Sequence, residues 1–341
     1  MHDGLAATVN ALATTVNASM PACRHAEGMR LSMFLAAATV TAGCAHPQAP
    51  GMNASTTPSE QAAQLRDGRQ LTWAEWGDPQ GRPAFFFHGG ADSRLAAAVI
   101  DAPAREAGVR LIAPDRPGYG GSDPHPSGGL STWPDDVFAL ADQLGIESFS
   151  VMGHSAGGPH ALAIAADSHG RVDAVIVVCG AAPREAKGSG MGVPFRLNRW
   201  LAIRAPELNR KFLLSHRKSV YGDPEKFLRD WGRLSPPEGR LFRERPSIAQ
   251  LIIDEMREGY RQGIDAAARE NRALYEDWGF ELGRVEVPVA LYYGDADKMA
   301  PASWGRYLEA QLPFAQLHVV ADEGHFSTLV ETAPEILRHV R

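Results

Sequence analysis

The sequence predicts an α/β protein in which a mostly parallel sheet is covered by helices on both faces and interrupted by an inserted helical domain. Two observations predict this fold. Short apolar runs alternate with helical patterns from about residue 71 to 183, and again from residue 287 onward. Between these two stretches only helical patterns occur. A chain of 341 residues, 44% of them hydrophobic, can bury a core of the size that such a sheet needs.

The alternation predicts the elements in turn. The expected strands are 71–76, 84–88, 109–113, 148–152, 172–179, 287–293 and 315–320. The expected helices of the sheet layers are 95–107, 135–143, 159–166, 303–312 and 333–340. Apolar runs without polar alternation, such as the strand at 84–88, are typical of a parallel sheet that is buried on both faces. The strand at 71–76 is expected at an edge of the sheet.

The interruption divides the chain into parts. Residues 1–63 are predicted to be a leader and tether, 64–183 and 284–341 the α/β core, and 184–283 a helical cap. The net charge of −6 argues against a general nucleic-acid binder. The charge is uneven, because residues 184–240 carry 13 Lys and Arg against 6 Asp and Glu. Such a stretch can attract an anionic substrate or lipid headgroups, although a solvated helical face has the same composition.

The N-terminal region is similar to a bacterial lipoprotein signal. Met29-Arg30 precedes an apolar stretch at 31–40, and small residues then lead to Cys44, the cysteine that would be lipidated. The Pro-, Ser- and Thr-rich sequence that follows is expected to be an unfolded tether. This pattern favours a lipid-anchored or exported protein of the bacterial cell envelope, held to the membrane through Cys44. The alternative is a disordered, Ala-rich N-terminus on a cytoplasmic protein.

The pentapeptide GHSAG at residues 153–157 lies between an apolar strand and an Ala-rich helix. A serine nucleophile has to be exposed on a sharp strand-to-helix turn within reach of a base. Glycines two residues on either side of Ser155 suit such a turn, since they tolerate strained backbone angles. Ser155 is therefore the candidate nucleophile, although a plain Gly/Ser turn in a βα unit fits the same pentapeptide.

The base and its carboxylate partner are expected on loops that follow two later strands, because open parallel sheets place their sites at the carboxyl ends of strands. Asp297 follows the strand at 287–293, and His325 follows the strand at 315–320. The order Ser155, Asp297, His325 is the order expected for a nucleophile elbow on such a sheet. Asp295 and Asp322 are alternatives for the acid. We prefer Asp297 to Asp295 because its later position on the loop projects further toward His325.

An acyl-transfer site also needs backbone N–H groups that bind the oxyanion. The amide of Ala156 is one expected donor, and the amide of Gly90, in the HGG turn after the strand at 84–88, is the other. A plain tight turn is the alternative interpretation of HGG.

Together these motifs resemble the α/β-hydrolase superfamily. They are FHGG at 87–90, DRPGYG at 115–120, the elbow at Ser155, the loop 294–301 with Asp297, and Gly324-His325. The resemblance extends from about residue 71 to the C-terminus. It implies an eight-stranded sheet, a helical cap after the sixth strand, and a capped serine hydrolase that needs neither cofactor nor metal. Relatives that use an Asp nucleophile are disfavoured by Ser155.

The sequence thus predicts a hydrolase that cleaves an ester or related acyl bond of a small molecule through an acyl-enzyme. An acyltransferase, an aminopeptidase or a C–C hydrolase would use the same triad, and a binding protein without turnover is a further alternative. Aromatic residues of the predicted cap are candidate walls of the substrate pocket, with the cap core as the alternative for most of them: Trp200, Phe212, Phe227, Trp231, Tyr260 and Trp278.

Overall fold

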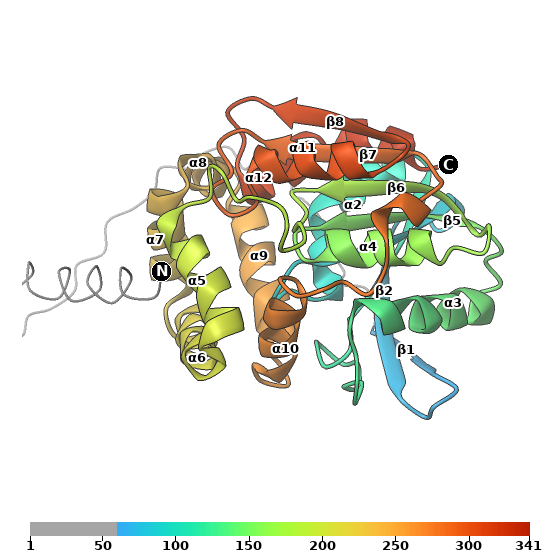
Figure 1. The fold of residues 1–341 in the computed structure, drawn as a ribbon, viewed down its shortest axis with the longest axis horizontal. Coiled ribbons are helices and arrows are strands. Elements are labelled where there is room, and N and C mark those ends of the chain that lie inside the picture. The colour runs from blue at the N-terminus through green and yellow to red at the C-terminus, as the bar shows by residue number, and fades with distance from the viewer. Residues whose placement is uncertain (1–59) are drawn as a thin grey trace, which may run out of the picture. The chain divides into compact units, whose positions relative to one another are not determined.

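The computed structural model describes residues 60–341, which form an eight-stranded sheet with helices on both faces (Figure 1). The strands are β1 (Gln61–Gln64), β2 (Gln70–Gly77), β3 (Arg82–Phe87), β4 (Val109–Pro114), β5 (Phe149–His154), β6 (Val172–Val178), β7 (Val289–Gly294) and β8 (Ala315–Val320). The predicted lipoprotein-type signal with Cys44 lies outside the described residues.

The strand order in the sheet is β1-β2-β4-β3-β5-β6-β7-β8. β2 is antiparallel to both β1 and β4, and all other neighbours are parallel. The prediction of an eight-stranded, mostly parallel sheet is therefore confirmed.

One edge of the sheet differs from the prediction. The strand expected at 71–76 is not at the edge, because β1 pairs with β2 and covers it. β1 begins at Gln61, inside the stretch 1–63 that we expected to be leader and tether. Its sequence, QAAQ, has no β-branched or aromatic residue, so no local preference marks it as a strand.

The helices of the sheet layers are α2 (Asp101–Glu106), α3 (Trp133–Gln143), α4 (Gly157–Ala166), α11 (Ala302–Gln311), α12 (His325–Glu331) and α13 (Ala333–Ile336), with short 3-10 segments at Arg94–Ile100, Leu130–Thr132, Leu282–Arg284 and Leu337–His339. The helix expected at 95–107 is a 3-10 segment followed by α2. The helix expected at 333–340 is only α13 and a 3-10 turn. Proline in the first turn of α13 lacks an N–H group and separates it from α12.

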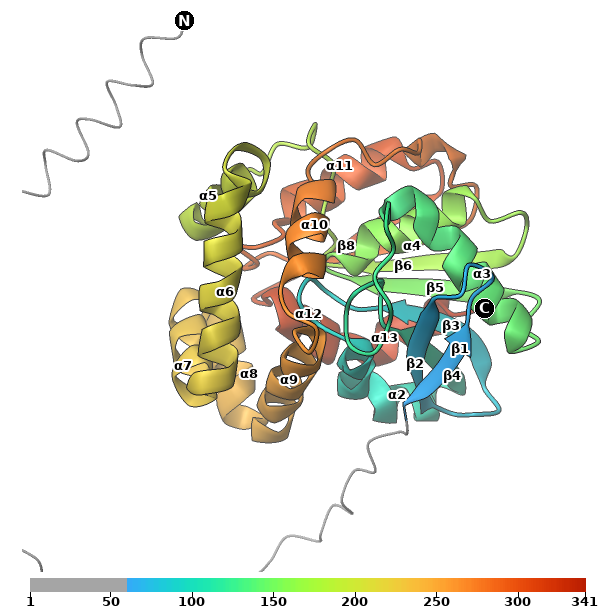
Figure 2. The same ribbon diagram turned by 90° about the horizontal axis from the view of Figure 1, so that it is seen from below.

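Between β6 and β7 the described chain is helical. This segment contains α5 (Val193–Arg204), α6 (Pro206–Gly222), α7 (Pro224–Leu234), α8 (Pro236–Glu244), α9 (Pro246–Gly259) and α10 (Asp265–Ala273), which gather on one side of the sheet (Figure 2). Each of α5 to α9 has a proline at its first or second position, where the missing N–H group costs nothing inside the helix and stops the preceding helix. Within residues 60–341 no helix is both long and apolar enough to span a bilayer.

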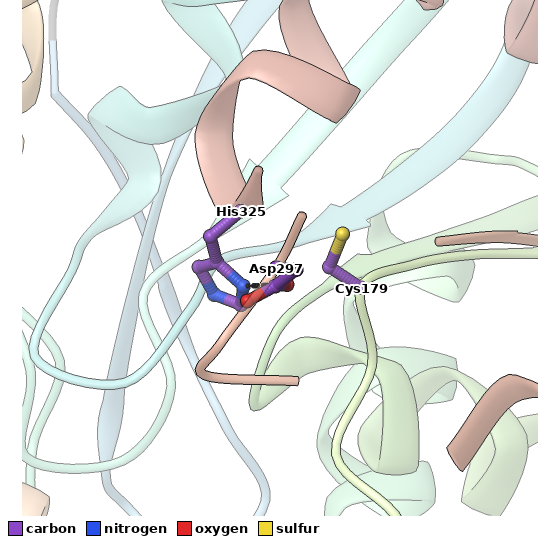
Figure 3. Close-up of side chains that lie close together, drawn as sticks. All are labelled: Cys179, Asp297 and His325. Atoms are coloured by element: carbon purple, nitrogen blue, oxygen red, sulfur yellow. Dashed lines mark hydrogen bonds and ion pairs between the residues drawn. The ribbon is translucent and has the colours of Figure 1, made fainter. Parts of the chain in front are cut away.

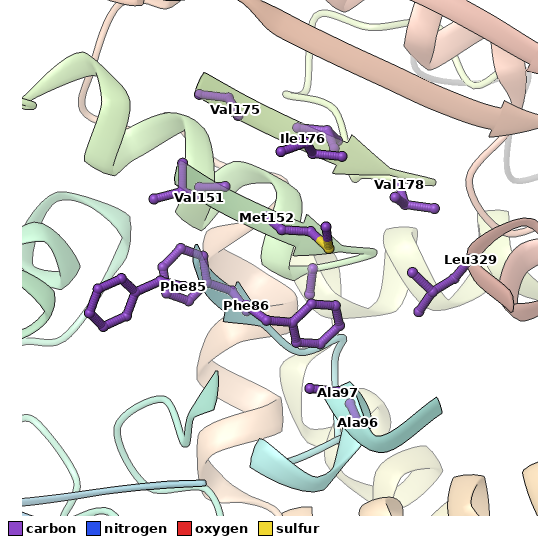
Figure 4. Close-up of a cluster of buried hydrophobic side chains, with 14 of the residues drawn as sticks. Phe85, Phe86, Ala96, Ala97, Val151, Met152, Val175, Ile176, Val178 and Leu329 are labelled. Atoms are coloured by element: carbon purple, nitrogen blue, oxygen red, sulfur yellow. The ribbon is translucent and has the colours of Figure 1, made fainter. Parts of the chain in front are cut away.

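The core lies along the central strands (Figure 4). Phe85 and Phe86 of β3, Val151 of β5 and Ile176 of β6 are fully buried. The rings of Phe85 and Phe149 meet edge to face with their centroids 4.7 Å apart. Densely packed strands of this kind hold the loops at their carboxyl ends in fixed positions.

Candidate active site

Ser155 occupies a strained turn between β5 and α4. Its φ is 55°, in the left-handed region that non-glycine residues rarely adopt and that is frequent at functional sites. The backbone is fixed by three hydrogen bonds. The Ser155 amide donates to the Val178 carbonyl (3.0 Å), and the Ser155 carbonyl accepts the amides of Gly158 and Ala181 (3.1 Å each). The turn thereby projects the hydroxyl-bearing side chain into the cavity described below.

The glycines around Ser155 are required by close backbone contacts. A β-carbon on Gly157 would overlap the carbonyl oxygen of Phe87, and one on Gly153 would overlap the carbonyl of Gly157. A β-carbon on Gly158 would lie 2.9 Å from Gly180 Cα. The glycines therefore let α4 approach β3 and β6 closely enough to form the turn.

Gly157→Ala is expected to lower the free energy of unfolding by about 1–3 kcal/mol, the usual cost of forcing an extra methyl group into a packed site. Denaturant unfolding measures the change. Gly222→Ala is the matched control, since a β-carbon there has nothing within 4 Å. Equal stability of the two variants would contradict the role assigned to Gly157.

His325 and Asp297 meet at the carboxyl edge of the sheet (Figure 3). His325 Nδ1 donates to Asp297 Oδ2 over 2.7 Å, and both side chains are buried. The other carboxylate oxygen, Asp297 Oδ1, accepts the amides of Met299 (2.7 Å) and Ala300 (3.0 Å). These bonds fix the carboxylate and orient the imidazole, with Nε2 left as the nitrogen available to a nucleophile.

The two alternative acids, Asp295 and Asp322, are hydrogen-bonded to each other through one carboxylate and one backbone amide. Asp295 Oδ1 accepts the amide of Asp322 over 2.8 Å. Asp322 has a φ of 59°, as a turn residue often does. Neither carboxylate has a hydrogen bond to His325 among the described residues, so the geometry favours Asp297.

Burial and charge oppose each other at His325. Burial of the imidazole disfavours its charged form, but the Asp297 carboxylate, by charge and hydrogen bond, outweighs burial and raises the pKa of His325 above 6.5. A histidine acts as a general base only when it is neutral.

The rate of ester hydrolysis is therefore expected to fall as the pH falls through a midpoint above 6.5. The measurement is kcat/KM between pH 5 and 9 with a neutral ester. An acidic midpoint below 6.5 would contradict the raised pKa of His325, and the absence of an acidic limb would contradict its assignment as the base. Asp295→Asn should leave the midpoint unchanged, because Asp295 does not contact the imidazole.

Cys179 lies beside this pair, and the three side chains together offer donor atoms within 4.8 Å of one another. Metal ions bind the thiolate form of cysteine. Burial raises the pKa of Cys179 well above its ordinary value, and the nearby Asp297 carboxylate adds to this effect. The Cys179 thiol donates to the Gly324 carbonyl (3.8 Å), and the Asp297 oxygens already accept from His325 and from two backbone amides.

The predicted oxyanion donors lie on adjacent loops. A β-carbon on Gly90 would be 3.7 Å from Ala156 Cβ, so the loop after β3 and the start of α4 are in contact. Arg116 fixes the backbone of the loop after β3, because its guanidinium donates to the carbonyls of His88 and Gly89, the latter over 2.9 Å. In a planar trans peptide the Gly90 N–H points away from the Gly89 carbonyl. Arg116 therefore fixes the direction of that N–H.

Two carboxylates from the helical segment between β6 and β7 bind the loops that carry the candidate residues, and sequence reasoning missed both. Glu270 of α10 accepts two bonds from Arg116 (2.7 and 2.9 Å). Glu238 of α8 accepts the amides of Phe326 (3.1 Å) and Ser327 (3.3 Å) in the first turn of α12, which begins at His325. A carboxylate at a helix N-terminus is stabilising there. No pattern in the sequence links these residues.

A cavity of about 350 Å³ opens beside Ser155 and His325. Four of the predicted aromatic walls line it, namely Phe212, Phe227, Trp231 and Tyr260. Trp200 is 54% exposed, and Trp278 is buried against Phe280, so neither belongs to the lining. The lining residues of this cavity include no Lys or Arg, but three carboxylates: Asp92, Asp230 and Glu270.

Comparisons with known proteins assign the same fold that the structure shows. A family model described as alpha/beta hydrolase fold matches residues 83–332. The chain therefore belongs to the α/β-hydrolase family, and it is a hydrolase.

Relatives share the fold at low identity. A non-heme chloroperoxidase of Streptomyces lividans is 29% identical over 80% of this chain and 94% of its own length. A 2-hydroxy-6-oxononadienedioate/2-hydroxy-6-oxononatrienedioate hydrolase of Cupriavidus pinatubonensis is 26% identical over 66% of this chain and 73% of its own. Among solved structures, an alpha/beta hydrolase fold protein of Nakamurella multipartita superposes with a TM-score of 0.61 at 22% identity, covering 82% of this chain and 99% of that one.

Proposed function

We propose that the protein is a serine hydrolase that cleaves an ester or related acyl bond through Ser155, His325 and Asp297. The observation that carries the proposal is the 2.7 Å hydrogen bond between the buried His325 and Asp297, at a cavity that Ser155 also lines. A histidine that a carboxylate orients in this way activates a serine hydroxyl within reach of its Nε2.

In the proposed reaction His325 Nε2 takes the proton of Ser155 as its Oγ attacks the acyl carbonyl. Asp297 keeps the imidazole in the required tautomer and stabilises its charge. The amides of Gly90 and Ala156 bind the oxyanion. His325 then protonates the leaving group and activates the water that hydrolyses the acyl-enzyme. These steps use no cofactor or metal.

The cavity favours a neutral or weakly polar small-molecule acyl substrate. Its walls are largely apolar, with several aromatic side chains, and its lining includes no Lys or Arg. A substrate with two carboxylates, such as the dioate named for the Cupriavidus relative, would find no Lys or Arg among the lining residues to pair with. For this reason we rank ester hydrolysis above C–C hydrolysis. Acyl transfer and aminopeptidase activity would use the same residues and stay alternatives.

Labelling with a fluorophosphonate tests the proposal. The wild-type chain is expected to lose activity toward a short p-nitrophenyl ester as one adduct forms, and peptide mass spectrometry should place that adduct on Ser155. Ser155→Ala is expected to form no adduct. A folded wild-type protein that stays unlabelled while a reference serine hydrolase reacts would refute the proposal, and it would favour the binding protein without turnover.

We also propose that the protein is held in the bacterial cell envelope by a lipid on Cys44. The signal-like sequence that ends at Cys44 supports this proposal. Mass spectrometry of the mature N-terminus decides it. A chain that begins at Met1 or Met29 with an unmodified Cys44 would contradict lipidation and favour a cytoplasmic location.

A further inference from the structure

Helix α5 exposes an apolar face to solvent. Val193, Leu197 and Trp200 are spaced by four and three residues, so they lie on one side of the helix. They are 67%, 53% and 54% exposed. Isolated exposed apolar residues are ordinary, but a row of large ones along a helix marks an interaction surface.

The apolar surface continues onto α6, which packs against α5. We call the combined surface the outer cap face and define it by six exposed apolar residues of these two helices, which are Val193, Leu197, Trp200, Ile203, Leu208 and Leu214. Both views of the ribbon place α5 and α6 on the side of the helical segment that is remote from the sheet (Figures 1 and 2). The outer cap face is therefore not covered by any other part of residues 60–341.

The outer cap face is strongly basic. Residues 193–222 contain seven Lys and Arg and one acidic residue, Glu207, in a chain whose net charge is −6. Arg196, Arg204, Lys211 and Lys218 are exposed and have no ion pair within the described part of the chain. Helices with Trp and Leu beside Lys and Arg suit the boundary of an anionic bilayer, where the apolar side chains enter the acyl region and the cations meet phosphate groups.

The same face borders the catalytic cavity. Three cavity-lining residues of the helical segment between β6 and β7 are themselves exposed: Pro194 of α5, Phe212 of α6 and Leu234 of α7. The cavity mouth thus opens next to the outer cap face, and an acyl chain leaving a bilayer at this surface would meet an apolar passage toward Ser155.

We propose that the outer cap face docks on the surface of an anionic lipid bilayer, so that membrane-derived acyl lipids are the substrate class of the site. The substrate half of this proposal rests on the proposed hydrolase function, whereas the docking half does not. A second copy of the chain is a poorer occupant, because two such basic faces repel each other. Residues 1–59 are poorer too, since their two acidic and two basic side chains offer no complementary charge.

Vesicle binding tests the docking. The test protein is the full chain with two substitutions. Cys44→Ala removes any lipid anchor, and Ser155→Ala removes turnover. This protein is mixed either with vesicles of pure phosphatidylcholine or with vesicles that contain equal amounts of phosphatidylcholine and phosphatidylglycerol. The bound fraction is measured by sedimentation. We expect binding to the anionic vesicles to be at least tenfold stronger and to weaken as salt is added.

Two variants in the same background probe the face itself. Leu197→Ser with Trp200→Ser is expected to weaken binding to anionic vesicles at least tenfold. Phe314→Ser is the matched control, because Phe314 is 59% exposed but lies outside the helical segment, just before β8. It should bind like the parent chain. Lys211→Gln with Lys218→Gln should reduce the salt dependence.

Several outcomes would overturn the docking proposal. Unchanged binding in the Leu197/Trp200 variant is one. Another is a dimer, seen by analytical ultracentrifugation, that this variant loses while vesicle binding is absent. Hydrolysis is scored separately in chains that keep Ser155. If no chain cleaves a soluble ester, the proposed function fails while the binding result still stands. If soluble esters are cleaved but vesicle lipids are not, only the substrate class fails.

Discussion

Asp297→Asn is expected to lower kcat for ester hydrolysis by about 10⁴-fold, the loss typical of a triad that lacks its carboxylate. The Asp297 carboxylate accepts the Nδ1 proton of His325 over 2.7 Å. An amide at this position can donate to Nδ1 instead and would leave Nε2 protonated, unable to accept the Ser155 proton. Steady-state kinetics with a p-nitrophenyl ester measures the change. The fold should survive, because Asn keeps the oxygen that accepts the amides of Met299 and Ala300.

Asp295→Asn is the control for this experiment. Asp295 is on the same loop, but its carboxylate accepts the Asp322 amide rather than a proton of His325. We expect its kcat to stay within a few-fold of wild type, as is usual for groups that do not touch the reacting atoms. If Asp295→Asn abolished turnover while Asp297→Asn did not, the acid would be Asp295.

Arg116→Met is expected to lower kcat by about 10²–10³-fold, comparable to the loss of one oxyanion donor. Arg116 donates to the Gly89 carbonyl and so fixes the Gly90 N–H on the opposite side of the same peptide plane. Without it that peptide unit can rotate, and the donor is no longer held toward the oxyanion. KM should change little, since the ground-state carbonyl needs this bond less than the transition state does.

Loss of Arg116 alone would also leave Glu270 buried without its ion pair, at a cost of about 3–5 kcal/mol of stability. The double variant Arg116→Met with Glu270→Gln removes both charges and keeps an acceptor for Tyr119 Oη, which donates to Glu270 over 2.8 Å. Its stability should largely return while kcat stays low. A trifluoromethyl ketone, which mimics the tetrahedral intermediate, should lose affinity by the same factor as kcat/KM. Recovery of kcat together with stability would show that Arg116 supports only the fold.

The sequence predicted the sheet and the order of the candidate catalytic residues because both depend on local patterns. Each apolar run marks a strand by itself, and Ser155, Asp297 and His325 each follow a strand end directly. The cavity walls were less predictable. Phe212 and Trp231 line the cavity, whereas Trp200 points to solvent, and this difference depends on how helices of the segment between β6 and β7 pack. Helical periodicity shows which side of a helix is apolar, but it does not show which other element that side packs against.

What the sequence determined by itself was therefore the α/β architecture, the turn at Ser155 and the chain order of the proposed nucleophile, acid and base. Only the tertiary structure decided which groups hold these residues in place. Glu270 meets Arg116 across 154 positions of sequence, and Glu238 meets the first turn of α12 across 88. The strand β1, with no β-forming residue, exists because β2 offers it an edge to pair with. Such contacts depend on how distant segments pack, and no local periodicity or propensity encodes that packing.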